Sequence, residues 1–211
     1  MFQESGLLNL IGCDQLVWSK IGVGYYPVQD QPYDQEYWSR YRLMDATEMG
    51  SALTQARIAM VRRHWQGELI DVGIGGGRFV ADCSGAFGYD INPHAIEWLF
   101  TKHKYKTPYA GKVKCASMWD SIEHIDRFDE LLNNVTDYVF MSTPIYEDAN
   151  HVLRSKHFRK DEHFWYFTAD GLIEVMKFLG FALIEANRIE ETIGREDIGS
   201  FTFKRFKNAP N

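Results

Sequence analysis

The stretch that decides the fold is Leu69-Ile-Asp-Val-Gly-Ile-Gly-Gly-Gly77. Its first four residues are apolar apart from Asp71, which predicts a short buried strand. The four glycines that follow predict a tight turn, because glycine lets the backbone approach a ligand more closely than other residues do. The helix expected to begin at Arg78 would present unpaired backbone N–H groups there. We therefore expect a ligand-binding strand–turn–helix unit.

Beyond this unit, strands and helices alternate, which predicts βαβ units and an α/β fold with a mostly parallel sheet. The last two strands have no helix between them, which predicts an antiparallel C-terminal pair at one edge of the sheet. The expected strands are 68–72, 86–90, 112–119, 137–142, 181–189 and 200–206, and the expected helices start at 78 and span 93–103, 121–132 and 168–179.

Residues 1–66 have a different character, since they are rich in aromatic residues and mixed in charge. Two helices are expected, at 33–44 and 47–65, and Thr47 is a candidate N-terminal cap of the second. In that second helix, apolar residues recur at helical spacing. They are Met49, Leu53, Ala56, Met60 and Val61. We expect residues 1–66 to form a helical extension or lid, and 67–211 to form the ligand-binding domain.

The composition sets limits on the class of protein. The chain has 211 residues, 45% of them hydrophobic, which suits one globular domain. Its net charge of −6 disfavours nucleic acid and anionic membranes as partners. Cys13, Cys83 and Cys115 cannot all pair, and we expect reduced thiols in a cytoplasmic protein. The first residues lack the basic start of a secretion signal, and no apolar run is long enough to predict a membrane span.

The glycine turn does not fit the dinucleotide fingerprint G-x-G-x-x-G. Counted from Gly73, that pattern needs glycine where the chain has Arg78, and counted from Gly75 it needs glycine where the chain has Val80. An NAD-dependent oxidoreductase is therefore a disfavoured alternative. The observed pattern is instead an acid, Asp71, followed by glycine at every second position as far as Gly77.

This pattern resembles the first motif of class I S-adenosylmethionine (SAM)-dependent methyltransferases. The segment Gly88-Tyr-Asp-Ile-Asn-Pro-His-Ala95 is similar to their second motif. Trp119-Asp-Ser-Ile-Glu-His-Ile125 is similar to the Glu-His segment of many members that act on small molecules. The resemblance extends from about residue 68 to 207 and implies a Rossmann-like, doubly wound fold with SAM as cofactor.

The resemblance also implies which residues hold the cofactor. Asp71 suits the ammonium side of SAM, Asp90 suits the paired ribose hydroxyls because a carboxylate accepts two hydrogen bonds, and Ile91 suits the adenine. Residues 91–111 leave little room for the third strand of the family's sheet, so we expect that strand to be reduced or absent. The adenine contacts that it often carries are expected from residues 117–119. The expected cofactor residues are Asp71, Gly73, Gly75, Gly77, Asp90, Ile91, Met118 and Trp119.

Methyl transfer requires alignment of donor and acceptor and, for some acceptors, a base. His124 is the candidate base because histidine titrates near neutral pH, and Glu123 is a candidate to orient it or to contact the substrate. The alternative is that both residues cap or pack the following helix. Tyr37 and Tyr41 could face the sulfonium, because aromatic faces attract cations; the alternative is that these rings pack in the core.

The segment 151–167 mixes basic and aromatic residues, and its His157 and Arg159 are candidate contacts for an anionic acceptor; the alternative is a solvated loop. Histidines recur in it at six-residue intervals, at 151, 157 and 163. Because this spacing matches no compact ligand pattern, no metal is expected.

The leading hypothesis is a SAM-dependent methyltransferase acting on an oxygen or nitrogen of a small-molecule acceptor. Five lysines between Trp98 and Trp119 leave a nucleic-acid (RNA or modified DNA) methyltransferase as an alternative. A non-catalytic SAM-binding protein is a third hypothesis. The acceptor itself and the oligomeric state are not predicted, because acceptor pockets in this fold are built from variable loops.

Overall fold

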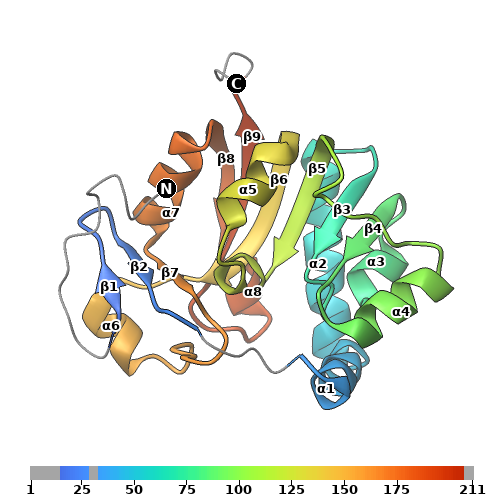
Figure 1. Ribbon diagram of the computed structural model, residues 1–211, viewed down its shortest axis with the longest axis horizontal. Coiled ribbons are helices and arrows are strands. Elements are labelled where there is room, and N and C mark those ends of the chain that lie inside the picture. Colours follow the sequence, from blue (N-terminus) through green and yellow to red (C-terminus); the bar gives the residue numbers. More distant parts are fainter. Residues whose placement is uncertain (1–14, 29–32, 207–211) are drawn as a thin grey trace.

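The computed structural model describes residues 15–28 and 33–206. A six-stranded sheet forms its centre, with strand order β4-β3-β5-β6-β9-β8 (Figure 1). Four strands, β4, β3, β5 and β6, run parallel, and β9 is antiparallel to both β6 and β8. The predicted mostly parallel sheet with an antiparallel pair at one edge is therefore confirmed. The strands are β3 (Leu69–Val72), β4 (Ala86–Tyr89), β5 (Val113–Trp119), β6 (Val135–Pro144), β8 (Phe181–Asn187) and β9 (Ile198–Arg205).

Helices cover both faces of this sheet, as the doubly wound architecture requires. The helices are α1 (Gln35–Asp45), α2 (Glu48–His64), α3 (Arg78–Asp82), α4 (Pro93–Thr101), α5 (Phe128–Asn134), α6 (Ala149–Arg154), α7 (Ala169–Phe178) and α8 (Ile189–Thr192). The segment 121–132, expected as one helix, is instead a 3₁₀ turn, η1 (Ile122–His124), followed by α5.

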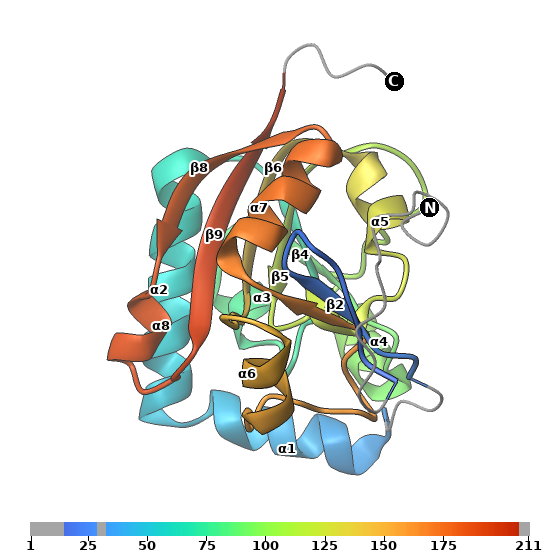
Figure 2. The same ribbon diagram turned by 90° about the vertical axis from the view of Figure 1, so that its left-hand side faces the viewer.

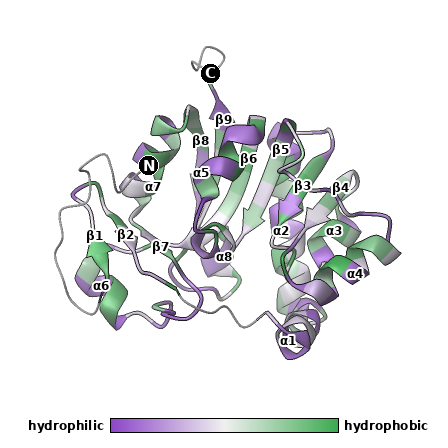
Figure 3. Ribbon diagram, viewed as in Figure 1, coloured by the Kyte–Doolittle hydropathy of each residue, from purple (hydrophilic) through white to green (hydrophobic). Residues whose placement is uncertain are grey.

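The alternation of side chains along the central strands divides the core between the two faces. On β3, Ile70 and Val72 pack in the cluster that contains residues of α5 and α7. Leu69 points the other way and packs with Met60 and Val61 of α2. Figure 3 shows hydrophobic residues concentrated on the strands of the large sheet, whereas α1 is mostly hydrophilic.

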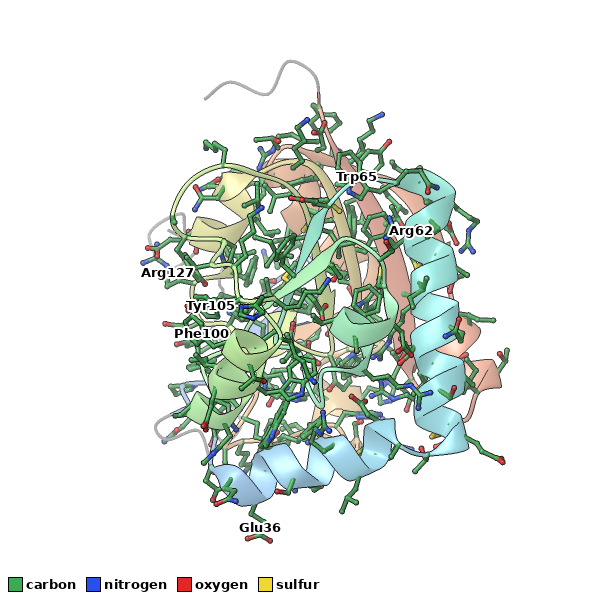
Figure 4. All side chains as sticks on the ribbon, turned by 90° about the vertical axis from the view of Figure 1, so that its right-hand side faces the viewer. Glu36, Arg62, Trp65, Phe100, Tyr105 and Arg127 are labelled. Atoms are coloured by element: carbon green, nitrogen blue, oxygen red, sulfur yellow. The ribbon has the colours of Figure 1, made fainter. Side chains whose placement is uncertain are left out.

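The sheet ends at β4 within the described residues. Beyond β4, Tyr105 makes a single parallel bridge to Gly88, and nothing longer forms. The ring of Tyr105 stacks on Phe100 with centroids 4.6 Å apart, beside α4 (Figure 4). The third strand of the fold is thus reduced to one bridge, as residues 91–111 predict.

The N-terminal region is helical only in part. Helices α1 and α2 lie where they are expected, and Thr47 caps α2 by accepting the N–H of Gly50 at 3.0 Å. The expectation of a helical extension is wrong for residues 15–28. There β1 (Val17–Trp18) and β2 (Val23–Tyr25) form a hairpin, which pairs antiparallel with β7 (Trp165–Phe167) in a second small sheet (Figure 1).

This pairing joins segments on either side of the expected boundary at residue 66, which a sequence pattern of short strands could not reveal.

The apolar stripe predicted on α2 is buried at Met60 and Val61, whereas Met49 is 43% exposed. Cys83 and Cys115 are buried free thiols, and Cys13 lies outside the described residues. Within 15–28 and 33–206, no helix has both the length and the apolar character needed to cross a bilayer.

Candidate active site

A cavity of about 390 Å³ opens where the carboxyl ends of β3, β4 and β5 meet. Ligands bind at this edge of parallel α/β sheets because the loops there leave a crevice. Helix α1 runs across the same end of the molecule and closes the cavity from that side (Figures 1 and 2). The cavity therefore has a floor of strand ends and a helical cover.

The glycine turn after β3 forms part of this floor. Gly73, Gly75 and Gly77 all have positive φ angles, of 76°, 55° and 87°, which favour glycine strongly. Gly73 and Gly75 line the cavity, whereas Gly77 does not. A Cβ atom at Gly77 would lie 2.7 Å from the ring of Trp98. The role of Gly77 shown by the structure is thus to start α3 and to admit α4 close by.

Asp90 lies directly after β4 and lines the cavity. Its Oδ2 accepts the N–H of Ile74 in the glycine turn at 2.9 Å, and its Oδ1 accepts the N–H of Asn92 at 2.8 Å. Burial raises the pKa of Asp90, and these backbone donors oppose the rise. Each oxygen keeps a second lone pair, so the carboxylate can accept further hydrogen bonds.

Asp71, at the end of β3, is 1% exposed and also lines the cavity. Its Oδ1 accepts the hydroxyl of Ser117 at 2.6 Å. Burial raises its pKa to about 7. Asp45, Asp120 and Asp126 line the same space, so the cavity collects carboxylates. A cationic ligand would relieve the cost of burying these charges.

A charged network that the sequence does not predict closes one side of the cavity. Glu190 is fully buried and accepts Nε and Nη2 of Arg57, at 2.7 and 2.9 Å, and Nη1 of Arg195 at 2.8 Å. Asp120 binds the same two arginines. Burial alone would raise the pKa of Asp120, but Arg195 and Arg57 hold it at about 2.

Aromatic side chains form another part of the cavity wall. Tyr33, Tyr37 and Tyr41 line the cavity from α1 and the residues before it. The hydroxyl of Tyr37 donates to that of Tyr41 at 3.2 Å, and the Tyr33 and Tyr37 rings meet edge to face with centroids 5.1 Å apart. The structure therefore brings both tyrosines predicted for the lid, Tyr37 and Tyr41, to the cavity. Ile91 and Trp119 also line it.

His124 lines the cavity, but Glu123 does not. The Nδ1–H of His124 donates to the carbonyl of Glu162 at 3.1 Å, and burial lowers the pKa of the ring to about 4. Glu123 is 2% exposed and accepts the hydroxyl of Thr143 at 3.1 Å. Burial and the nearby Asp120 raise its pKa to about 8.

Besides Gly77 and Glu123, three further expected site residues do not line the cavity. Met118 is fully buried in the core, because side chains alternate along β5 and Trp119 takes the cavity side. His157 donates from Nε2 to the carbonyl of Glu196 at 3.1 Å, and Arg159 pairs with Glu162 at 3.2 Å. Neither lines the cavity.

The lysine-rich stretch also lies away from the cavity. Lys104 donates to the carbonyl of Ala86 at 3.0 Å, and Lys112 donates to that of Asn133 at 2.9 Å. Lys106 pairs with Glu68 at 3.3 Å. These contacts are typical of a solvated edge and offer no approach to the strand ends.

Several lining residues have no motif that marks them in the sequence, namely Asp45, Thr54, Arg57, Tyr109 and Phe164. Asp45 accepts the backbone N–H of Arg78 at 3.0 Å and so ties α1 to the start of α3. Asp45 belongs to the aromatic-rich region for which a lid is expected from the sequence. The contribution of α2 carries no such signal.

The model of a family described as a methyltransferase domain matches residues 37–186. No curated protein matches the sequence. Among solved structures, magnesium protoporphyrin IX methyltransferase from Synechocystis, with bound S-adenosylhomocysteine (SAH), is 11% identical with a TM-score of 0.58, over 82% of this chain and 96% of that chain.

Two further structures share the fold. A protein from Thermotoga maritima described as a possible histamine N-methyltransferase is 15% identical with a TM-score of 0.55, over 81% of this chain and 96% of that one. A glycopeptide N-methyltransferase in complex with SAM is 11% identical with a TM-score of 0.52, over 75% and 87% of the two chains.

Proposed function

The chain belongs to the methyltransferase family whose model it matches, and we propose that it transfers the methyl group of SAM to an oxygen or nitrogen atom of a small-molecule acceptor. The observation that carries this proposal is the position of Asp90. Its carboxylate faces the same cavity as the glycine turn, at the adjoining strand end.

The residues of the cavity fit SAM. The cavity volume of about 390 Å³ is in the range of small-molecule sites. Asp90 would hold the ribose hydroxyls, Ile91 would contact the adenine, and Gly73 and Gly75 would leave room for the methionine part. A Cβ atom added at Gly75 would meet only Tyr41, at 3.5 Å, within 4 Å. Asp71 would place its carboxylate on the side of the cavity that receives the ammonium group of SAM.

SAM supplies an activated methyl group, and the protein has to bind, align and exclude water. The tyrosine wall of α1 excludes water and offers aromatic faces to a cation. His124 is the lining residue that we propose to act on the acceptor. Its Nδ1–H donates to the carbonyl of Glu162, which leaves the lone pair on Nε2 to accept a proton.

A small acceptor is favoured over nucleic acid by the form of the site. Helix α1 covers the strand ends, and the lysines between residues 102 and 114 do not line the cavity. Five aspartates line it with one arginine, and Glu190 and Asp120 neutralise that arginine. Proteins of the same fold include the methyltransferases of a porphyrin and of a glycopeptide, both solved with SAM.

The proposal is tested in two steps. Titration calorimetry of the full chain with SAH should show one site, and a folded protein that binds neither SAH nor SAM would overturn the proposal. Incubation with methyl-labelled SAM and a fractionated extract should then label a small-molecule fraction. Label removed by nuclease treatment would indicate the nucleic-acid alternative, and SAM binding without transfer to any fraction would indicate a non-catalytic protein.

A further inference from the structure

We propose that Glu123, His124 and His163 form a binding site for a divalent transition-metal ion at the wall of the cavity. One ligand atom from each residue lies within 4.8 Å of the other two. Glu123 and His124 come from η1, directly after β5, and His163 comes from the segment that leads into β7. The two histidines are 39 positions apart, so the fold alone brings them together.

The contacts of His124 match those of a metal ligand. Metal-binding histidines usually donate their other ring N–H to a carbonyl or carboxylate, which fixes the tautomer. The Nδ1–H of His124 donates in this way to the carbonyl of Glu162 at 3.1 Å. The lone pair is therefore on Nε2, in the neutral form that binds metals.

His163 supplies an independent observation. Its side chain is buried, at 3% exposure, and its Nδ1 has no hydrogen-bond partner among the described residues. A buried polar atom without a partner costs about 1–3 kcal/mol, and such atoms call for an explanation. The ring meets that of His124 edge to face, with centroids 4.5 Å apart. A bound ion would account for an unpaired nitrogen at this place.

Glu123 completes the set with an oxygen ligand. It is 2% exposed, and its Oε2 accepts a hydrogen bond from the hydroxyl of Thr143. The buried carboxylate lies beside two imidazole rings, and a bound cation would balance its charge.

Two imidazole nitrogens and one carboxylate oxygen favour zinc and its first-row neighbours over magnesium or calcium. Three protein ligands leave coordination positions open, and because His124 lines the cavity, an open position can face an acceptor there. When the ion is bound, Nε2 of His124 is a ligand, and the ion takes over the activation of the acceptor that is proposed above for His124 in the metal-free chain.

The catalytic use of the ion rests on the proposed function. An acceptor hydroxyl bound to the ion loses its proton to water more readily. The oxygen then bonds to the methyl carbon while the methyl–sulfur bond breaks and its electron pair stays on sulfur, which yields SAH.

The test uses the full chain, freed of metal with a chelator that is then removed, and titrated with Co²⁺. We expect one equivalent to bind with the visible absorption of a low-coordinate site, and Zn²⁺ to displace it. His163→Gln and Glu123→Gln should each weaken Co²⁺ binding at least tenfold, whereas His151→Gln, which alters a histidine outside the cluster, should not. Thermal unfolding establishes that each variant is folded, and Glu123→Gln, close in shape to the native residue, provides the test if His163→Gln is unstable.

Failure of this inference is distinguishable from failure of the proposed function. A folded chain that binds SAH but no Co²⁺, or Co²⁺ binding unchanged in both variants, would overturn the metal site and leave the methyltransferase proposal intact. Co²⁺ binding lost in the variants, in a chain that binds neither SAM nor SAH, would support the metal site and overturn its proposed catalytic use.

Discussion

Replacing Asp90 by alanine separates cofactor recognition from the rest of the site. The Asp90 carboxylate accepts backbone N–H groups from Ile74 and Asn92, at 2.9 and 2.8 Å, and keeps lone pairs toward the cavity. In the proposed complex these lone pairs accept both ribose hydroxyls. Asp90→Ala removes both hydrogen bonds to the ligand and also deprives two backbone donors of their acceptor.

The expected loss of affinity follows from these contacts. A hydrogen bond to a charged group contributes about 1.5–3 kcal/mol, so two at the low end contribute about 3 kcal/mol. At about 1.4 kcal/mol for each factor of ten, SAH should bind Asp90→Ala roughly 150-fold more weakly than the wild type. The two unsatisfied N–H groups should also lower the free energy of unfolding, by about 1–3 kcal/mol.

Calorimetry with SAH, well below the melting temperature of the variant, measures the first quantity, and denaturant unfolding measures the second. Asp82→Asn is the matched control, because Asp82 is an exposed acid on α3 in an i,i+4 pair with Arg78. Its affinity for SAH should be that of the wild type. If Asp90→Ala bound SAH within threefold of the wild type, the ribose would not lie on this carboxylate and the assignment of the cofactor site would be refuted.

Three further predictions concern the glycine turn and the buried charges. Gly77→Ala should destabilise the fold by about 1–3 kcal/mol, because φ is 87° and the added Cβ would lie 2.7 Å from a tryptophan ring of α4. Gly75→Ala should destabilise the fold less, because its φ is also positive but its Cβ would meet only Tyr41, at 3.5 Å, and it should weaken SAH binding more than Gly77→Ala does. Equal effects of the two substitutions on unfolding and on affinity would contradict this difference. Glu190→Gln should lower the free energy of unfolding by about 2–4 kcal/mol, measured in denaturant, because Arg57 and Arg195 lose one of their two carboxylate partners. An unchanged free energy of unfolding would show that the fold does not depend on this network. Burial raises the pKa of Asp71 from 3.8 to about 7, so between these pH values the native state holds a proton that the unfolded state releases. As the pH rises from 5 to 7, the free energy of unfolding of the wild type should therefore fall relative to that of Asp71→Asn, by up to about 1.4 kcal/mol for each pH unit. Parallel curves of unfolding free energy against pH would refute the shift.

The sequence predicts the parts of the fold that local patterns encode. The run Leu69–Gly77 identifies a buried strand and its turn because both depend on consecutive residues. The reduced third strand follows from the short distance between Asp90 and Lys112, and the structure confirms it as a single bridge at Tyr105. Capping by Thr47 is likewise a local effect.

The hairpin of β1 and β2 could not be predicted in this way, because each strand has only two or three residues and its partner β7 is about 140 positions away. Strands this short carry no periodicity, and their register depends on the partner. For the same reason the sequence does not show which of Met118 and Trp119 faces the cavity, and the structure places Trp119 there. A strand of unknown exact phase allows either of two neighbours to face the cavity.

The same distinction, between features that local sequence encodes and features that depend on distant contacts, applies to the candidate site. The positions of Asp71, Asp90, Gly73 and Gly75 at the cavity follow from the sequence because the strand ends of a parallel sheet lie together, whereas Gly77 lies outside it. The cavity contacts of Thr54 and Arg57 are not, because they depend on how α2 is rotated against the sheet. The cluster of Glu123, His124 and His163 shows the limit most clearly: the Glu-His pair is visible in the sequence, but its third member is fixed by the path of the chain before β7.

The distribution of partners among the buried acids argues for a cationic ligand. Asp120 and Glu190 share two arginines, so their charges are balanced within the protein. Asp71 and Asp90 border the same cavity but have only a hydroxyl and backbone N–H groups as partners in the described chain. Burial raises the pKa of both, and the charge of Arg57 opposes this rise only in part for Asp71. A ligand that brings positive charge and hydroxyl donors to these two strand ends offsets that cost, and a neutral or anionic ligand would not, which is why the sulfonium and ammonium groups of SAM suit this cavity better than the pyrophosphate of a dinucleotide.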